Sequence, residues 1–202
     1  MKIPKIRVLS NSSEIFNNPI YIQAKKQVEN AIQQVDWPLG TGTFSIYPES
    51  GKKKGEGNGV KPIKDNFIKD LEEQGWSPEL SIISGLGKSD AVLKTQGKIV
   101  AVAEWETGNV SSSHRSLNKM AFAIQQQLII AGFLIVPCRN LARYLTDRIG
   151  NYEELEPYFD FWFNSIASLS YPAVIVILGI EQDEDSLLVP RIPKGTDGLA
   201  NN

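Results

Sequence analysis

The chain has 202 residues, of which 42% are hydrophobic and 22% charged, a composition typical of one soluble globular domain with a substantial core. Its formal net charge of −2 lacks the basic excess of most nucleic-acid-binding domains, so a surface for such a partner would have to be basic locally. The single cysteine excludes a disulfide framework and favours a reducing cytoplasm. The single histidine excludes a multi-histidine metal centre. We recognise neither a signal peptide nor a membrane-spanning run in the sequence.

The apolar pattern predicts one α/β unit. In chain order it indicates a helix over 21–35, a strand over 43–47, a lysine- and glycine-rich loop over 50–59, a helix over 66–74 stopped by Gly75, strands over 80–84, 91–94 and 98–103, a long helix over 112–126, a central strand over 128–136, helices over 140–147 and 153–169, a strand over 173–180 and a glycine-rich arm after Lys194.

Three carboxylates are expected to converge at the end of the strand over 98–103. Side chains two apart on a strand point to the same face, so Glu104 and Glu106 project together. Pairing with the preceding strand would return Asp90 beside Glu104. Such an oxygen cage suits Mg²⁺, the usual helper of phosphodiester hydrolysis. The alternative is that two surface glutamates merely alternate with Trp105 at a strand end.

A strand-to-helix turn follows these carboxylates directly. Asn109 or one of the next serines is a candidate N-cap, and a helix N-terminus beside a metal site is suited to binding phosphate. Asn109, Ser111 and Arg115 are also residue types that read base edges in DNA. The arrangement predicts an enzyme that cuts the duplex it reads.

The block Glu104–Lys119 resembles the corresponding block of the BamHI and OkrAI family of type II restriction endonucleases. Three further blocks match in the same order, namely Asn58–Lys64, Tyr144–Phe159 and Ile192–Gly198. None is a generic motif, and four in register are highly specific. The resemblance implies an α/β fold with a restriction-endonuclease-like PD-(D/E)xK core, in which helices flank a central mixed β-sheet on both sides. It also implies a single domain over 1–202 with a short C-terminal arm from about residue 190.

The resemblance implies that Asp90, Glu104 and Glu106 are the active-site carboxylates, with Asp90 and Glu104 holding Mg²⁺. Glu106 stands where most restriction nucleases of this fold carry lysine. It would act either as a general base toward the attacking water or as a ligand to a second metal ion. Glu79 corresponds to a further acidic member of the site, and Gly87–Asp90 lacks the proline that precedes the family aspartate.

A DNA-contacting set also follows from the resemblance. Asp147 and Arg148 would address cytosine and guanine, although a helix-terminal ion pair is the alternative explanation. His114 either touches the DNA backbone or packs at the helix start, and Lys52–Lys54 either contact phosphates or lie in a solvated loop. The expected set comprises Lys64, Asn109, Ser111, His114, Arg115, Asp147 and Arg148, with Gly195, Asp197 and Gly198 in an arm that approaches the minor groove.

The partners implied by the resemblance are palindromic double-stranded DNA, a second copy of the chain, and a cognate DNA methyltransferase that protects host DNA. The family target is GGATCC, cut after the first G to leave a four-base 5′ overhang. The aromatic run Phe159–Phe163 builds either the core or a dimer surface. Two other functions stay open: a catalytically silent DNA-binding relative, and a structure-directed or repair nuclease on the same scaffold.

Overall fold

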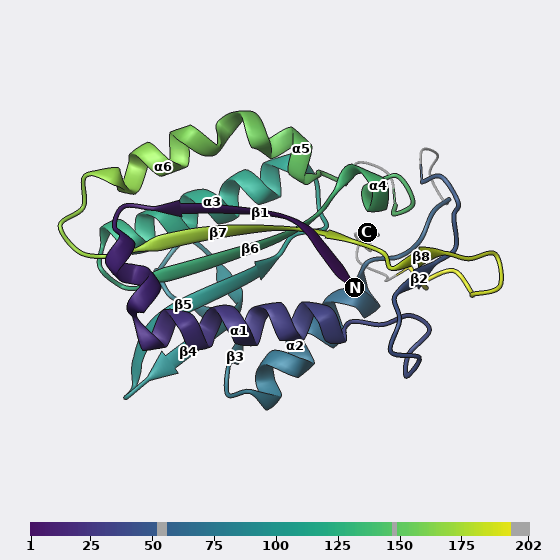
Figure 1. The fold of residues 1–202 in the computed structure, drawn as a ribbon, viewed down its shortest axis with the longest axis horizontal. Helices are drawn as coiled ribbons and strands as arrows, with labels where there is room; N and C mark the ends of the chain where they lie inside the picture. The colour runs from purple at the N-terminus through teal and green to yellow at the C-terminus, as the bar shows by residue number, and fades with distance from the viewer. Residues whose placement is uncertain (52–55, 147–148, 195–202) are drawn as a thin grey trace.

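The computed structural model describes residues 1–51, 56–146 and 149–194. Within these residues a six-stranded mixed sheet crosses the molecule in the order β1-β7-β6-β5-β4-β3 (Figure 1). The central strands β5, β6 and β7 run parallel, and the outer pairs are antiparallel. The sheet strands are β1 (Lys2–Ser10), β3 (Ser77–Ser81), β4 (Lys88–Thr95), β5 (Lys98–Trp105), β6 (Ala131–Pro137) and β7 (Val174–Glu181), and a separate parallel pair consists of β2 (Ser45–Ile46) and β8 (Glu184–Asp185).

Helices cover both faces of the sheet (Figure 1). One face carries α1 (Pro19–Gln34) and α2 (Lys61–Glu73), and the other carries α3 (Val110–Gln125) and α6 (Phe159–Ala167). None of the helices in the described part of the chain is long and apolar enough to cross a membrane. The shorter elements are α4 (Arg139–Ala142), α5 (Tyr152–Leu155) and the 3-10 turns η1 (Ser13–Asn17) and η2 (Glu156–Tyr158).

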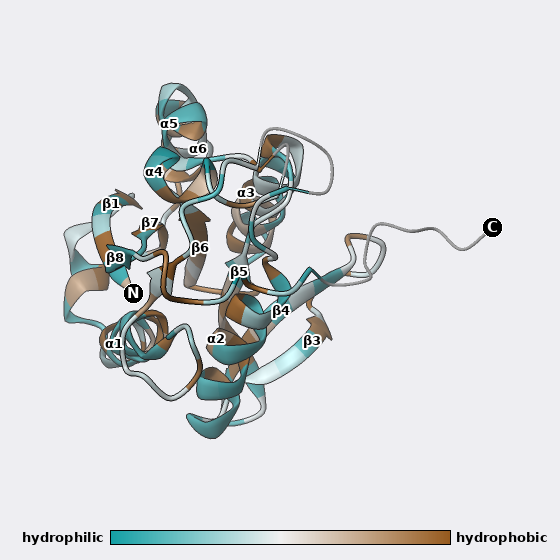
Figure 2. Ribbon diagram, turned by 90° about the vertical axis from the view of Figure 1, so that its right-hand side faces the viewer, coloured by the Kyte–Doolittle hydropathy of each residue, from teal (hydrophilic) through white to brown (hydrophobic). Residues whose placement is uncertain are grey.

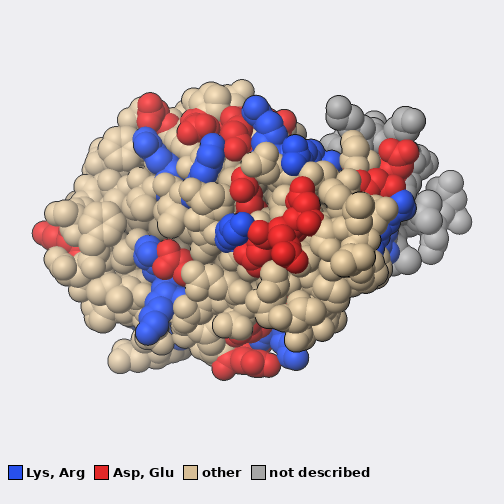
Figure 3. Space-filling model, turned by 45° about the vertical axis from the view of Figure 1, so that its right-hand side comes forward, with Lys and Arg blue, Asp and Glu red and all other residues tan. Residues whose placement is uncertain are grey.

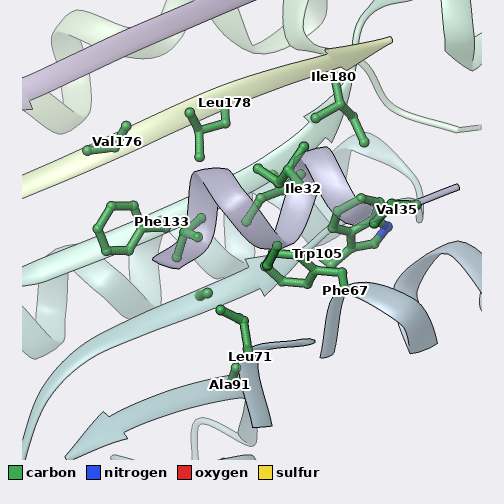
Figure 4. Close-up of a cluster of buried hydrophobic side chains, with 14 of the residues drawn as sticks. Ile32, Val35, Phe67, Leu71, Ala91, Trp105, Phe133, Val176, Leu178 and Ile180 are labelled. Atoms are coloured by element: carbon green, nitrogen blue, oxygen red, sulfur yellow. The ribbon is translucent and has the colours of Figure 1, made fainter. Parts of the chain in front are cut away.

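The sheet separates two apolar clusters because successive side chains of a strand alternate between its faces. Figure 4 shows the cluster on the α1 and α2 side, where Ile32, Phe67 and Trp105 meet. Val102, three residues before Trp105, belongs to the opposite cluster under α3 and α6. Both helices on the first face turn hydrophilic residues outward (Figure 2). The central parallel strands β6 and β7 are buried almost throughout, which explains their continuous apolar sequences.

These observations confirm the expected α/β fold, with a central mixed sheet flanked by helices on both sides. The long helix begins at Val110 rather than at Ser112 because Asn109 caps it. The helix expected over 153–169 is divided into α5, η2 and α6 around Pro157, and the one expected over 140–147 ends at Ala142. Strand β1 was not expected, since it is an exposed edge strand whose register shifts beside Pro4.

Candidate active site

Three carboxylates lie together where β4 and β5 meet the start of α3. The antiparallel pairing of Ala91 with Ala103 sets Asp90 beside Glu104, as the sequence spacing predicted. The Trp105 backbone N–H donates to Asp90 Oδ2 at 2.8 Å, which ties the two strands at this point. Asp90, Glu104 and Glu106 line one cleft of ≈1340 Å³. The sheet thus brings to one cavity three side chains that are separated in the sequence.

Each carboxylate lies beside a polar side chain supplied by a helix. Lys64 of α2 donates to Asp90 Oδ1 at 2.7 Å. Lys119 of α3 places Nζ 2.5 Å from Glu104 Oε1. Ser116, also on α3, donates to Glu106 Oε1 at 2.5 Å. The carboxylate end of β5 is therefore held by helices from both faces of the sheet.

Burial makes the two glutamates unusually basic. It raises the pKa of Glu104 to about 7, and the charge of Asp90 acts in the same direction, while Lys119 opposes the shift. Burial also raises the pKa of Glu106, although the hydrogen bond from Ser116 lowers it in part. For Lys64 burial favours the neutral amine, but the adjacent Asp90 carboxylate outweighs this and raises its pKa. The lysine therefore stays charged, while Glu104 can exchange a proton near neutrality.

The donor set fits Mg²⁺ in its chemistry, since carboxylate oxygens are the hard ligands that this ion prefers. Glu104 Oε1 is buried and accepts no hydrogen bond from the described residues, although the Lys119 ammonium lies 2.5 Å away. In the described part of the chain no three Asp, Glu, His or Cys side chains stand at metal-binding spacing. Lys64 and Lys119 supply the positive charge beside Asp90 and Glu104 in this arrangement.

The start of α3 forms one wall of the same cleft. Asn109 caps the helix, with Oδ1 accepting from the Ser112 backbone N–H at 3.2 Å. Ser111 and Arg115 are exposed and line the cleft. His114 also lines it, but its ring lies against two aromatic residues, Tyr158 and Trp162, with centroids 4.9 and 5.2 Å away. The packing alternative for His114 therefore has direct structural support.

Charge is distributed unevenly over the molecule. On the face in Figure 3 acidic side chains gather beside basic ones, with no broad basic field. The cleft differs, because four cationic side chains line it against three carboxylates among the residues that the structure describes, a formal balance of +1, whereas the full chain carries −2. The four cationic residues are Lys64, Lys88, Arg115 and Lys119. The described lining of the cleft is thus less acidic than the chain as a whole.

Several expected site residues are not placed at the cleft. Glu79 is exposed on β3 with φ of +51° and does not line it. Lys52–Lys54, Asp147, Arg148, Gly195, Asp197 and Gly198 lie outside the described residues.

The segments that flank some of these positions are nevertheless anchored. The buried amide of Asn58 donates to the Tyr144 carbonyl at 2.9 Å and accepts from the Ile192 backbone N–H at 3.1 Å. Gly150 N–H donates to the Gly108 carbonyl at 2.8 Å, and a Cβ at Gly150 would lie 2.7 Å from the Val110 backbone. The chain after residue 148 therefore packs closely on the start of α3.

Two residues that contact the carboxylates, Ser116 and Lys119, were not expected from the sequence. They are three positions apart on α3 and therefore share one face of the helix. This three-residue spacing could have indicated that both side chains face the carboxylates. Ser116 and Lys119 also lie within the block that carries the family resemblance.

Comparisons with known proteins agree with this geometry. The profile of the family described as Restriction endonuclease BamHI matches residues 1–199. The type II restriction enzyme OkrAI of Oceanobacter kriegii is 42% identical over 204 residues, covering 99% of each chain. The type II restriction enzyme BamHI of Bacillus amyloliquefaciens is 31% identical over 211 residues, covering 99% of this chain and 93% of its own. A solved structure of restriction endonuclease BglII with a DNA 16-mer shares the fold, with a TM-score of 0.60 at 14% identity over 88% of this chain and 79% of that chain. The chain belongs to the BamHI family of restriction endonucleases.

Proposed function

We propose that the protein is a Mg²⁺-dependent type II restriction endonuclease that hydrolyses double-stranded DNA at the palindrome GGATCC. Cleavage after the first G would leave a four-base 5′ overhang. The observation that carries the proposal is the meeting of Asp90, Glu104 and Glu106 in one cleft with Ser111 and Arg115 at the start of α3. OkrAI and BamHI, named as type II restriction enzymes, support the reaction class.

The three carboxylates divide the chemistry between them. Asp90 and Glu104 would hold Mg²⁺, which would polarise the scissile phosphate and lower the pKa of a water molecule. Glu106 takes a proton from the water whose oxygen attacks phosphorus. The bond from phosphorus to the 3′ oxygen breaks, and the 3′ oxygen takes a proton from a solvent water molecule, which leaves a 5′-phosphate and a 3′-hydroxyl. Burial shifts the pKa of Glu106 upward, which is the direction that strengthens a carboxylate as a general base. The alternative role for Glu106 is as a ligand to a second metal ion.

Recognition would use the start of α3, where Ser111 and Arg115 line the cleft. Arg115 can bind a guanine edge with two hydrogen bonds, and Asn109 can bind an adenine edge in the same way. Asp147 and Arg148 would extend the reading surface, and Gly195, Asp197 and Gly198 would approach the minor groove. We expect the cognate methyltransferase to modify the same sequence and so protect host DNA.

A homodimer would present the same reading surface to both halves of the palindrome. Its contact surface is proposed around the exposed aromatic residues of α3 and α6, Phe122 and Phe161, which are 42% and 66% exposed. Phe159 and Trp162 of the same aromatic run are buried in the core. Two residues of this run therefore belong to the core, while Phe161 is exposed and can contribute to an interface.

Digestion of a DNA of known sequence, followed by sequencing of the new ends, tests this function. We expect cutting at GGATCC alone with Mg²⁺, and no cutting in excess chelator. Ca²⁺ should support binding without cleavage, because its larger and looser ligand shell positions water poorly. Asp90→Ala and Glu104→Ala should bind the cognate duplex but not cut it. Sequence-specific binding without cleavage by the unaltered protein would favour the catalytically silent relative. Sequence-independent cleavage of branched or damaged DNA would favour the structure-directed nuclease.

A further inference from the structure

Helix α3 holds both glutamates of the cleft through one of its faces. Ser116 Oγ donates to Glu106 Oε1 at 2.5 Å, and Lys119 Nζ lies 2.5 Å from Glu104 Oε1. Because residues three apart on a helix share a face, Ser116 and Lys119 point together toward the end of β5. The two contacts make α3 a common support for Glu104 and Glu106.

Lys119 is an uncommon residue in such a place. Its side chain is 8% exposed and that of Glu104 is 4% exposed. The ammonium also donates to the Lys88 carbonyl at 2.7 Å, at the start of β4. Burying a charge is costly unless it is paired, and a buried ion pair seldom stabilises a fold more than apolar side chains of similar volume. Stability alone therefore gives no reason for lysine at position 119, whereas fixing Glu104 does.

The same helix carries residues of the proposed reading surface. Asn109 caps α3, while Ser111 and Arg115 line the cleft from its first turns. Arg115 is the direct chain neighbour of Ser116. Over this short distance a helix moves as a rigid unit, because its backbone hydrogen bonds join each residue to the next turn. A small displacement of α3 on docking to DNA would therefore reach both glutamates.

We propose that Ser116 and Lys119 are positioning residues that couple the reading of the DNA sequence by α3 to the placement of Glu106 and Glu104. Full carboxylate geometry is then reached only when the start of α3 is seated on the cognate sequence. The inference rests on the proposed endonuclease function and adds to it a source of cleavage specificity. It requires no contact between DNA and either positioning residue.

Coupling of this kind is reciprocal. If the cognate sequence improves the placement of the carboxylates, it must also raise their affinity for a divalent cation, and by the same factor the cation raises the affinity for the cognate sequence. Ser116→Ala removes the contact to Glu106, and Lys119→Met removes the contact to Glu104 while keeping a long side chain. Either change should weaken the linkage between sequence and cation.

The test is calorimetric titration with Ca²⁺ of the protein saturated with a GGATCC duplex or with a duplex changed at one base. For the unaltered protein we expect Ca²⁺ to bind at least about tenfold more tightly with the cognate duplex, within the range of ordinary allosteric coupling. In Ser116→Ala and in Lys119→Met the ratio should fall below about threefold, and single-turnover cleavage with Mg²⁺ should fall about 100-fold. Cognate binding with Ca²⁺ present should change far less than the cleavage rate.

Lys98→Met is the matched control, because Lys98 is exposed at the opposite end of β5 from the carboxylates. This variant should keep the ratio of Ca²⁺ affinities and the cleavage rate of the unaltered protein. Thermal unfolding identifies folded variants, and Ser116→Ala carries the test alone if Lys119→Met does not fold. An unaltered ratio in folded Ser116→Ala would overturn the inference. So would a ratio near one in an unaltered protein that still cleaves only at GGATCC. Failure of the proposed function is distinct, since the unaltered protein would then neither cleave nor prefer the GGATCC duplex.

Discussion

The family resemblance assigns Glu106 to the position that lysine holds in most nucleases of this fold, and its surroundings favour a carboxylate there. It accepts a hydrogen bond from Ser116, and burial raises its pKa. A lysine ammonium at this position could not bind Mg²⁺ and, while protonated, could not take a proton from water. We therefore expect Glu106→Lys to lower the single-turnover cleavage rate by about 10²–10⁴-fold.

The matched control for this charge reversal is Glu72→Lys, since Glu72 is exposed on α2 and lies outside the cleft. It should cleave at the unaltered rate. A near-normal rate for Glu106→Lys would show that Glu106 is neither base nor metal ligand.

Cys138 provides a prediction that is independent of catalysis. The thiol is fully buried, and burial raises its pKa to about 12, with the charges of Glu153 and Glu181 acting in the same direction. Because the thiolate is the reactive form, the folded protein should resist iodoacetamide at pH 8, while the urea-unfolded chain should react at the rate of a free thiol. Mass spectrometry measures both. Rapid alkylation of the folded protein would mean that the site opens readily to solvent.

The parts of the site that could be predicted are those set by local pattern. Strand alternation and hairpin pairing place Asp90 and Glu104 together, because both follow from backbone geometry alone. The ammonium groups of Lys64 and Lys119 could not be placed in this way. Their positions depend on how α2 and α3 pack against opposite faces of the sheet, which is a long-range property of the fold.

At the scale of elements, the start of α3 combines a structural role with a proposed reading role in one side chain. Asn109→Ala removes the acceptor for the Ser112 backbone N–H and should lower the free energy of unfolding by about 1 kcal/mol. Asn109→Asp keeps that acceptor and adds a favourable charge at the helix N-terminus. It cannot donate to an adenine edge, so we expect it to restore stability without restoring cognate affinity.

Denaturant unfolding and duplex titration measure the two effects of Asn109 separately. Full recovery of cognate binding in Asn109→Asp would restrict Asn109 to a capping role. A stability of Asn109→Ala equal to that of the unaltered protein would show that Ser112 N–H has another partner.

The elements that sequence patterns predicted are those with a regular apolar repeat. Central strands β6 and β7 and helix α1 were recognisable because they bury a continuous run or one helical stripe. Strand β1 gave no such signal, since its lysines, arginine and proline suit an exposed edge of the sheet. Its position beside β7 is set by cross-strand pairing with residues far away in the chain.

At the scale of the molecule, the cleft lies where both helical layers meet the end of β5. Lys64 reaches Asp90 from α2, and Lys119 reaches Glu104 from α3. The carboxylates are therefore accessible to contacts from both faces at a single sheet end. Phe161 of α6 lines the cleft and remains 66% exposed in this arrangement.

The proposed homodimer can be tested through Phe161. An exposed aromatic residue beside other apolar groups contributes to an interface core, whereas a carboxylate buried there without a partner would oppose association. We expect Phe161→Glu to be folded, because Phe161 is mostly exposed, but to be a monomer by light scattering. Cleavage of the palindrome should fall as well, because one protomer reads only half of the site and because Phe161 itself lines the cleft, so light scattering is the measurement that tests the interface. Leu188→Glu is the control, because Leu188 is 97% exposed and does not line the cleft, and this variant should remain a dimer. A Phe161→Glu variant that stays dimeric and cleaves normally would place the interface on another surface.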